Sequence, residues 1–181
     1  MSADHSRIIP CSEYRPVVLI AQSNEEDLNA IRNAAQEFDK FDVVTTNTGK
    51  GIVDYVNQIC FDAIILGLKF PDITGATVAY LVHHFDPLVS VAFLTTYKSN
   101  ILVAAAEDLN LKFWDKTEKL KDLNALCQDI YDLAMEVRCD DKTRIIKRMY
   151  MQPARAEYLK YRELLIPESI AQVMSLQQGS K

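Results

Sequence analysis

Cysteine and histidine are scarce in this chain, and neither is arranged for metal binding. The 181 residues include four cysteines and three histidines. They are Cys11, Cys60, Cys127, Cys139, His5, His83 and His84. Zinc sites need clustered ligands, such as paired cysteines two residues apart, and no such spacing occurs. We therefore expect no metal site, and we interpret the cysteines as buried reduced thiols.

The chain also lacks long apolar runs and the motifs of common enzymes. No apolar stretch is long enough to span a membrane, and residues 1–16 lack the apolar core of a secretory signal. The segment 48–51 contains two glycines, but it lacks the spacing of a phosphate-binding loop and is interpreted as a turn. No nucleophile–base pair is visible. We expect a cytoplasmic protein that is not an enzyme and has no cofactor or membrane contact.

Charge is unevenly distributed along an otherwise ordinary globular composition. Hydrophobic residues make up 49% of the chain and charged residues 25%, values well outside the disordered class. Residues 1–138 contain 12 Lys/Arg and 20 Asp/Glu, whereas residues 139–181 contain 8 and 5. This change of sign marks residues 139–181 as a separate compositional unit.

Apolar runs alternate with amphipathic stretches between residues 15 and 138. Strands are expected at 17–21, 41–46, 63–66, 89–95 and 111–114. Helices are expected at 24–38, 52–59, 75–85, 100–106 and 120–137, with Thr117 capping the last of them. Strict alternation predicts an α/β fold, namely a flavodoxin-like doubly wound five-stranded parallel sheet. In such sheets ligands bind at the carboxyl ends of the strands.

The chain is expected to divide into an N-terminal tail (1–14), the α/β domain (15–138) and a helical C-terminal extension (139–181). The extension is too short to build a core of its own, so it is expected to pack on its own domain, a second copy or another protein. Its basic residues are interleaved with Glu157 and Glu163. Nucleic acid is therefore the less favoured partner.

The segment from Phe61 to Gly75 combines an apolar strand with a loop that contains Pro71 and ends in a glycine. It resembles the centre of a response-regulator receiver domain, and the resemblance extends over about residues 15–137. Members of that family carry a phosphate-accepting aspartate directly after the third strand. Gly67 stands at this position here, and glycine cannot form an aspartyl phosphate. The chain thus resembles the degenerate members called pseudo-receivers.

The same resemblance assigns the other positions of the phosphorylation centre. Receivers hold Mg²⁺ with two acidic residues after the first strand, and Gln22 and Ser23 occupy those positions here. Thr95 (or Thr96) matches the hydroxyl that binds the phosphoryl group, and Lys116 matches the lysine that neutralises it. Because all three acidic positions are lost from this degenerate phosphorylation pocket, we expect neither Mg²⁺ binding nor phosphoryl transfer.

The retained hydroxyl and lysine have explanations that involve no chemistry. A threonine suits the end of a strand. Lys116 no longer faces an acidic cluster at the strand ends and is interpreted as a solvated side chain. Glu25, Glu26 and Asp27 fall in the first turn of a helix, where the helix dipole accounts for their acidity.

In receivers the fourth helix, fifth strand and fifth helix form the face that carries the output. The resemblance places a partner face here at Tyr97, Lys98, Lys112, Phe113, Trp114 and Lys119. Strand alternation is expected to turn only one of Phe113 and Trp114 inward. The favoured hypothesis is a phosphorylation-independent, receiver-like adaptor or scaffold in a two-component signalling pathway, with a protein partner or a second copy bound. The alternatives are a DNA-binding regulator that uses the basic extension and a small-ligand sensor that uses the vacated pocket.

Overall fold

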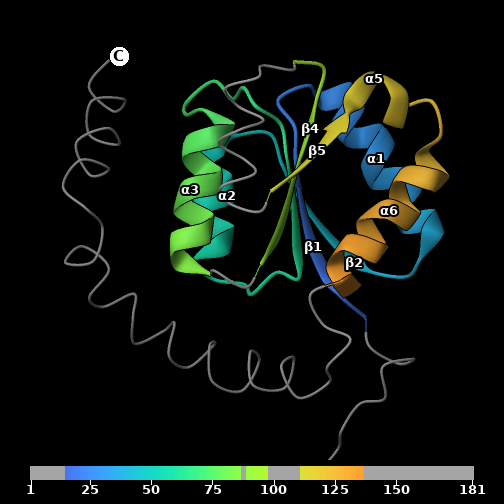
Figure 1. Cartoon of the computed structure of the whole chain (residues 1–181), viewed down its shortest axis with the longest axis horizontal. Helices are drawn as coiled ribbons and strands as arrows, with labels where there is room; N and C mark the ends of the chain where they lie inside the picture. Colours follow the sequence, from blue (N-terminus) through green and yellow to red (C-terminus); the bar gives the residue numbers. More distant parts are fainter. Residues whose placement is uncertain (1–14, 87–88, 98–110, 137–181) are drawn as a thin grey trace, which may run out of the picture.

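The computed structural model describes residues 15–86, 89–97 and 111–136. In these residues five parallel strands form one central sheet in the order β2–β1–β3–β4–β5 (Figure 1). The strands are β1 (Val17–Ala21), β2 (Asp42–Thr46), β3 (Ala63–Leu66), β4 (Ser90–Thr95) and β5 (Lys112–Asp115). This order confirms the predicted flavodoxin-like arrangement, in which ligand sites lie at the carboxyl ends of the strands.

Helices cover both faces of the sheet (Figure 1). They are α1 (Glu25–Phe38), α2 (Gly49–Val56), α3 (Gly75–Phe85), α5 (Lys116–Lys119) and α6 (Leu123–Glu136). The helices α2 and α3 pack on one face, and α1, α5 and α6 lie on the other. The helix expected at 100–106, the N-terminal tail and the C-terminal extension lie outside the described residues.

Side-chain oxygen atoms accept hydrogen bonds from the first backbone N–H groups of these helices. Asn24 Oδ1 accepts from Asp27 N at the start of α1, and Asp122 Oδ1 accepts from Ala125 N at the start of α6, both at 2.9 Å. Each such cap stabilises a helix by about 0.5–2 kcal/mol. The prediction that Thr117 caps the last helix is wrong. Asp115 accepts from the backbone of Thr117 and Glu118 and starts the short helix α5 earlier.

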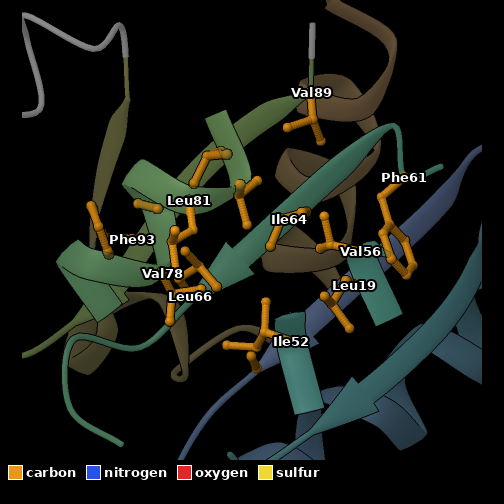
Figure 2. Packing of buried hydrophobic residues seen from close by; sticks show 14 of the residues in the cluster. Leu19, Ile52, Val56, Phe61, Ile64, Leu66, Val78, Leu81, Val89 and Phe93 are labelled. Atoms are coloured by element: carbon orange, nitrogen blue, oxygen red, sulfur yellow. The ribbon is translucent and has the colours of Figure 1, made fainter. Parts of the chain in front are cut away.

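Alternate residues of each central strand belong to two separate apolar clusters, one on each face of the sheet. Leu19, Ile64 and Phe93 pack against α2 and α3 (Figure 2), whereas Ile20 and Leu94 pack against α1 and α6. All six residues of β4 and all four of β3 are buried. Each fully buried aliphatic side chain contributes about 1.5–3 kcal/mol. Burial on both faces explains why these strands are continuous apolar runs rather than alternating ones.

The edge strand β5 corrects one expectation, since both of its aromatic residues pack against the body of the domain. Phe113 lies on the α2/α3 side with its ring centroid 5.0 Å from that of Phe93. Trp114 packs on the α1/α6 side. The expectation that only one of them points inward is wrong, because helices cover both faces of the sheet.

The described residues include two cysteines, Cys60 and Cys127, and Cys127 is a free thiol. Cys127 is fully buried, and burial raises the pKa of its thiol to about 11. A neutral thiol is a poor nucleophile, so the interpretation of a buried, inert cysteine holds for Cys127. Cys60 is only half-buried, and Cys11 and Cys139 lie outside the described residues.

Gly75 begins α3 where the backbone of two segments comes very close together. A Cβ atom at Gly75 would lie 2.0 Å from the carbonyl oxygen of Gly67 and 2.9 Å from the Cα of Leu68. The amide of Gly75 also donates to the carbonyl of Leu68 at 2.8 Å. Only a residue without a side chain fits here, because backbone atoms cannot yield as a flexible side chain would. The closing glycine of the predicted loop is therefore a steric requirement.

Gly75→Ala is expected to lower the free energy of unfolding by about 1–3 kcal/mol, the usual cost of overpacking a filled site. Gly67→Ala is the matched control. Its Cβ would lie 3.3 Å from the nearest atom, the side-chain oxygen of Gln22, and we expect a change below about 0.5 kcal/mol. Urea unfolding of both variants measures the difference. Equal destabilisation by the two alanines would contradict the steric argument.

Candidate functional site

The carboxyl ends of β1 and β3 lie side by side because the strand register aligns them. Ala21 pairs with Leu66 at the last position of both strands, and the amide of Gly67 donates to the carbonyl of Ala21 at 2.8 Å. The next residues, Gln22 and Gly67, therefore meet at the edge of the sheet. Both of these positions belong to the degenerate phosphorylation pocket predicted from the sequence.

Gln22 fills the space beside Gly67. Only 2% of the residue is exposed, and its Oε1 lies 3.3 Å from where a Cβ of residue 67 would be. Its Nε2 donates to the carbonyl oxygen of Leu94 at 3.3 Å. The amide thus spans from β1 across β3 to the end of β4. The sequence shows Gln22 only as a position without the expected carboxylate, and no signal in it predicts this cross-strand bridge.

Lys116 forms an ion pair with Asp27, which corrects its interpretation as a solvated lysine. Its Nζ lies 2.5 Å from Oδ2 of Asp27, and the two side chains are 16% and 27% exposed. Asp27 belongs to the first turn of α1, whereas Lys116 begins α5 directly after β5. The helix dipole is therefore not the whole explanation for this acidic residue. Asp27 supplies the charge partner that the strand ends no longer provide.

The hydroxyl of Thr95 takes part in a local turn at the end of β4. Thr95 is 7% exposed, and its Oγ1 accepts a hydrogen bond from the backbone N–H of Tyr97 at 3.0 Å. Thr96 and Ser23 are exposed. The five predicted pocket residues therefore separate into three that are largely buried and hydrogen-bonded or ion-paired, one exposed serine, and the glycine that Gln22 covers.

The segment 48–51 is the start of a helix rather than a plain turn. Thr48 caps α2, and the carboxylate of Asp72 accepts hydrogen bonds from Gly49 N at 2.8 Å and from Lys50 N at 2.6 Å. A Cβ at Gly49 would lie 1.7 Å from Cγ2 of Ile73, so the absence of a side chain at Gly49 leaves room for the loop that carries Asp72 and Ile73. The N–H groups at this helix start are thus already bound to a carboxylate of the chain itself.

The described lysines of the predicted partner face, Lys112 and Lys119, are both ion-paired. Each of the four lysines between residues 112 and 121 forms an ion pair: Lys112 with Glu136, Lys116 with Asp27, Lys119 with Asp129 and Lys121 with Glu118. The Nζ of Lys119 also lies 5.9 Å from the ring centroid of Trp114. Lys98 lies outside the described residues. A face that is rich in lysine in the sequence is therefore not a free basic patch.

Tyr97 is the most exposed large hydrophobic residue in the described part of this face. It is 54% exposed, and the Nζ of Lys69 lies 5.7 Å from its ring centroid. The ring is therefore presented at the carboxyl edge of the sheet beside the loop after β3. Aromatic residues of this kind are enriched in the centres of protein interfaces.

Neither a metal site nor a membrane span is found in the part of the chain that the structure describes. No group of three or more His, Cys, Asp or Glu side chains there is arranged to hold a metal ion. No helix among residues 15–86, 89–97 and 111–136 is long and apolar enough to cross a membrane.

Several solved structures share this fold, all with low sequence identity. The signal receiver domain of a LuxO repressor protein from Vibrio parahaemolyticus has a TM-score of 0.64 and 20% identity, covering 72% of this chain and 98% of that one. The phosphorylated cyanobacterial phytochrome response regulator RcpA has a TM-score of 0.59 and 21% identity, covering 67% and 95%. The manganese-bound form of the response regulator Rcp1 gives 0.57 and 20%, covering 65% and 92%.

No model of a known protein family matches the sequence, and no curated protein matches it either. The likeness to solved structures thus shows the receiver fold, and with it the flavodoxin-like topology that the sequence predicted. Two of the similar proteins were solved with a phosphoryl group or with manganese bound.

The bridge made by Gln22 is expected to stabilise the site. Gln22→Ala removes the donor to the Leu94 carbonyl and leaves a cavity, so the free energy of unfolding should fall by about 1–3 kcal/mol. Ser23→Ala, one residue along and exposed, is the control and should change it by less than about 0.5 kcal/mol. Chemical denaturation monitored by circular dichroism measures both. An unchanged free energy of unfolding in Gln22→Ala would show that the bridge contributes nothing to stability.

Proposed function

We propose that this protein is a phosphorylation-independent, receiver-like signalling adaptor or scaffold that acts by binding another protein. The observation that carries the proposal is the contact between Gln22 and Gly67. A neutral amide occupies the place beside the position where the family pattern has its phosphate acceptor, and residues 22, 23 and 67 bear no carboxylate. Mg²⁺ prefers oxygen ligands that include carboxylates, and none remains at these positions.

The receiver fold supports a signalling role, because the similar solved structures include response regulators in phosphorylated and metal-bound forms. Such activation depends on groups that this chain replaces with Gln22, Ser23 and Gly67. An output of this domain would then be set by binding a partner rather than by covalent modification, and a partner shifts an equilibrium only through differential affinity.

The charge balance of the partner face favours a protein over a nucleic acid as the occupant of that face. Binding phosphate groups there would require lysines to leave the carboxylates that already neutralise them. Nucleic-acid affinity comes largely from cations that are free to neutralise phosphates. A DNA-binding role would therefore have to come from the extension at 139–181, outside the described residues.

The small-ligand sensor is the weaker alternative, because the residues that would line the vacated pocket are already engaged. The amide of Gln22 bonds Leu94, the hydroxyl of Thr95 accepts from Tyr97, and Lys116 pairs with Asp27. A ligand would have to displace these internal partners and repay the interactions lost.

The purified protein is expected to acquire no hydroxylamine-labile phosphate from acetyl phosphate with Mg²⁺. Gly67→Asp alone should also stay unlabelled, because residues 22 and 23 still supply no carboxylate for Mg²⁺. A receiver domain with all three acidic residues, treated in parallel, is the positive control. Labelling of the wild-type protein would refute phosphorylation independence.

A protein partner is expected to co-purify with the full-length chain and to be lost in Tyr97→Ser. An exposed aromatic anchor at an interface typically contributes about 2 kcal/mol or more, which is roughly a thirtyfold loss of affinity on truncation. Tyr80→Ser is the matched control, since Tyr80 is 45% exposed but lies on α3. A chain ending at Arg138 tests the extension separately. Recovery of only nucleic acid would favour the DNA-binding alternative.

A further inference from the structure

Two places at the carboxyl edge of the sheet would attract an anion, and carboxylates of the chain already occupy both. One is the Nζ of Lys116, which pairs with Asp27. The other is the N-terminus of α2, where Gly49 and Lys50 donate to Asp72. Unbound cations and helix N-termini are the usual sites at which an external anion binds. Here neither is free to receive one.

We infer that Gln22, Asp27 and Lys116 form an internal lock that holds the carboxyl edge of the sheet in one arrangement without any bound anion. Within this lock, Asp27 is the counter-ion of Lys116, and the uncharged Gln22 connects β1 to β4 through its hydrogen bond to Leu94. The inference rests on the absence of phosphoryl chemistry in the proposed function, but it does not depend on the adaptor role.

The ion pair of the lock differs from the other surface pairs in its burial. Lys116 and Asp27 are 16% and 27% exposed. The corresponding values are 32% and 38% for Lys119 and Asp129, and 64% and 65% for Lys121 and Glu118. Exposed pairs are screened by water and salt and contribute little. A shielded pair interacts more strongly, and removal of one partner leaves a charge without compensation in a poorly hydrated place.

The lock also joins segments that lie far apart in the sequence. Asp27 lies in α1 and Lys116 begins α5, directly after the register pair Thr95–Asp115 that joins β4 to β5. The Gln22 amide bonds Leu94, the residue before Thr95. The Gln22–Leu94 hydrogen bond therefore restrains the end of β4, and the Asp27–Lys116 ion pair restrains the end of β5 against α1. Tyr97 and Trp114 of the partner face follow or adjoin these strand ends.

A double-mutant cycle on the full-length protein tests the lock, with amide hydrogen exchange as the readout. Lys116→Met and Asp27→Asn are each expected to speed exchange at residues 95–97 and 113–117 about tenfold. The double variant Lys116→Met/Asp27→Asn removes both charges, and should exchange more slowly than the product of the two single effects predicts. Independent, multiplicative effects would overturn the inference.

Two controls separate the lock from general charge effects. Lys121→Met breaks the exposed pair with Glu118, and Glu26→Gln removes a first-turn acid that is exposed. Each should change exchange at the same residues less than about twofold. If either control speeds exchange as much as Lys116→Met does, the inference is overturned, because any loss of charge would then produce the effect.

Addition of an external anion tests whether the carboxyl edge of the sheet still has a free anion site. Inorganic phosphate with Mg²⁺, added to the wild-type protein, should leave exchange at residues 95–97 unchanged. Slower exchange would overturn the lock, because an external anion would then be completing the site. These outcomes separate the lock from the adaptor role. If no protein partner is recovered with the wild-type chain while the coupling of Asp27 and Lys116 is intact, the adaptor alone is refuted. If acetyl phosphate labels the wild-type protein, phosphorylation independence is refuted and the lock with it, whereas absence of the coupling alone refutes only the lock.

Discussion

The register of β1 and β3, which makes the two strands end side by side, is the constraint on which the rest of this site depends. The pair Ala21–Leu66 is the last of both strands, and the strands are held there by burial on both faces of the sheet. A one-residue slip would turn every side chain to the opposite face. Gln22 and Gly67 are therefore bound to meet, and Gly75 is in turn required to let α3 begin against the Gly67 carbonyl.

Charge compensation follows from the same geometry. A lysine beyond the end of β5 needs an anion, and the positions that carry carboxylates in the receiver pattern hold an amide, a hydroxyl and a hydrogen. Asp27, in the first turn of α1, pairs with the ammonium group instead. The centre stays neutral overall, without the repulsion that clustered carboxylates create.

The fold and the residues of the candidate site were predictable to different degrees from the sequence. The strand order followed from the strict alternation of apolar and amphipathic stretches, and the closing glycine of the loop was visible as a pattern. The Asp27–Lys116 pair was not, because its members are 89 positions apart on helices whose rotation no periodicity specifies. Phe113 and Trp114 were misjudged for a related reason, since alternation shows two faces but not that both are covered. The ion pairs of Lys112 and Lys119 were not predictable either, because their partners Glu136 and Asp129 come from another helix.

The contrast between Gln22 and a carboxylate is the physical basis for proposing a centre that is receiver-like in fold but carries out no phosphoryl transfer. An amide carries donor and acceptor together, so Gln22 can face Gly67 with its oxygen while its nitrogen satisfies the Leu94 carbonyl. A carboxylate at the same position has no donor for that carbonyl, and it would need a cation to be stable when almost fully buried. The substitution thus removes the need for a metal and supplies a fixed cross-strand contact in its place. On the proposed function, partner binding falls to the surfaces beside this edge, where Tyr97 is the most exposed large hydrophobic residue among the described residues.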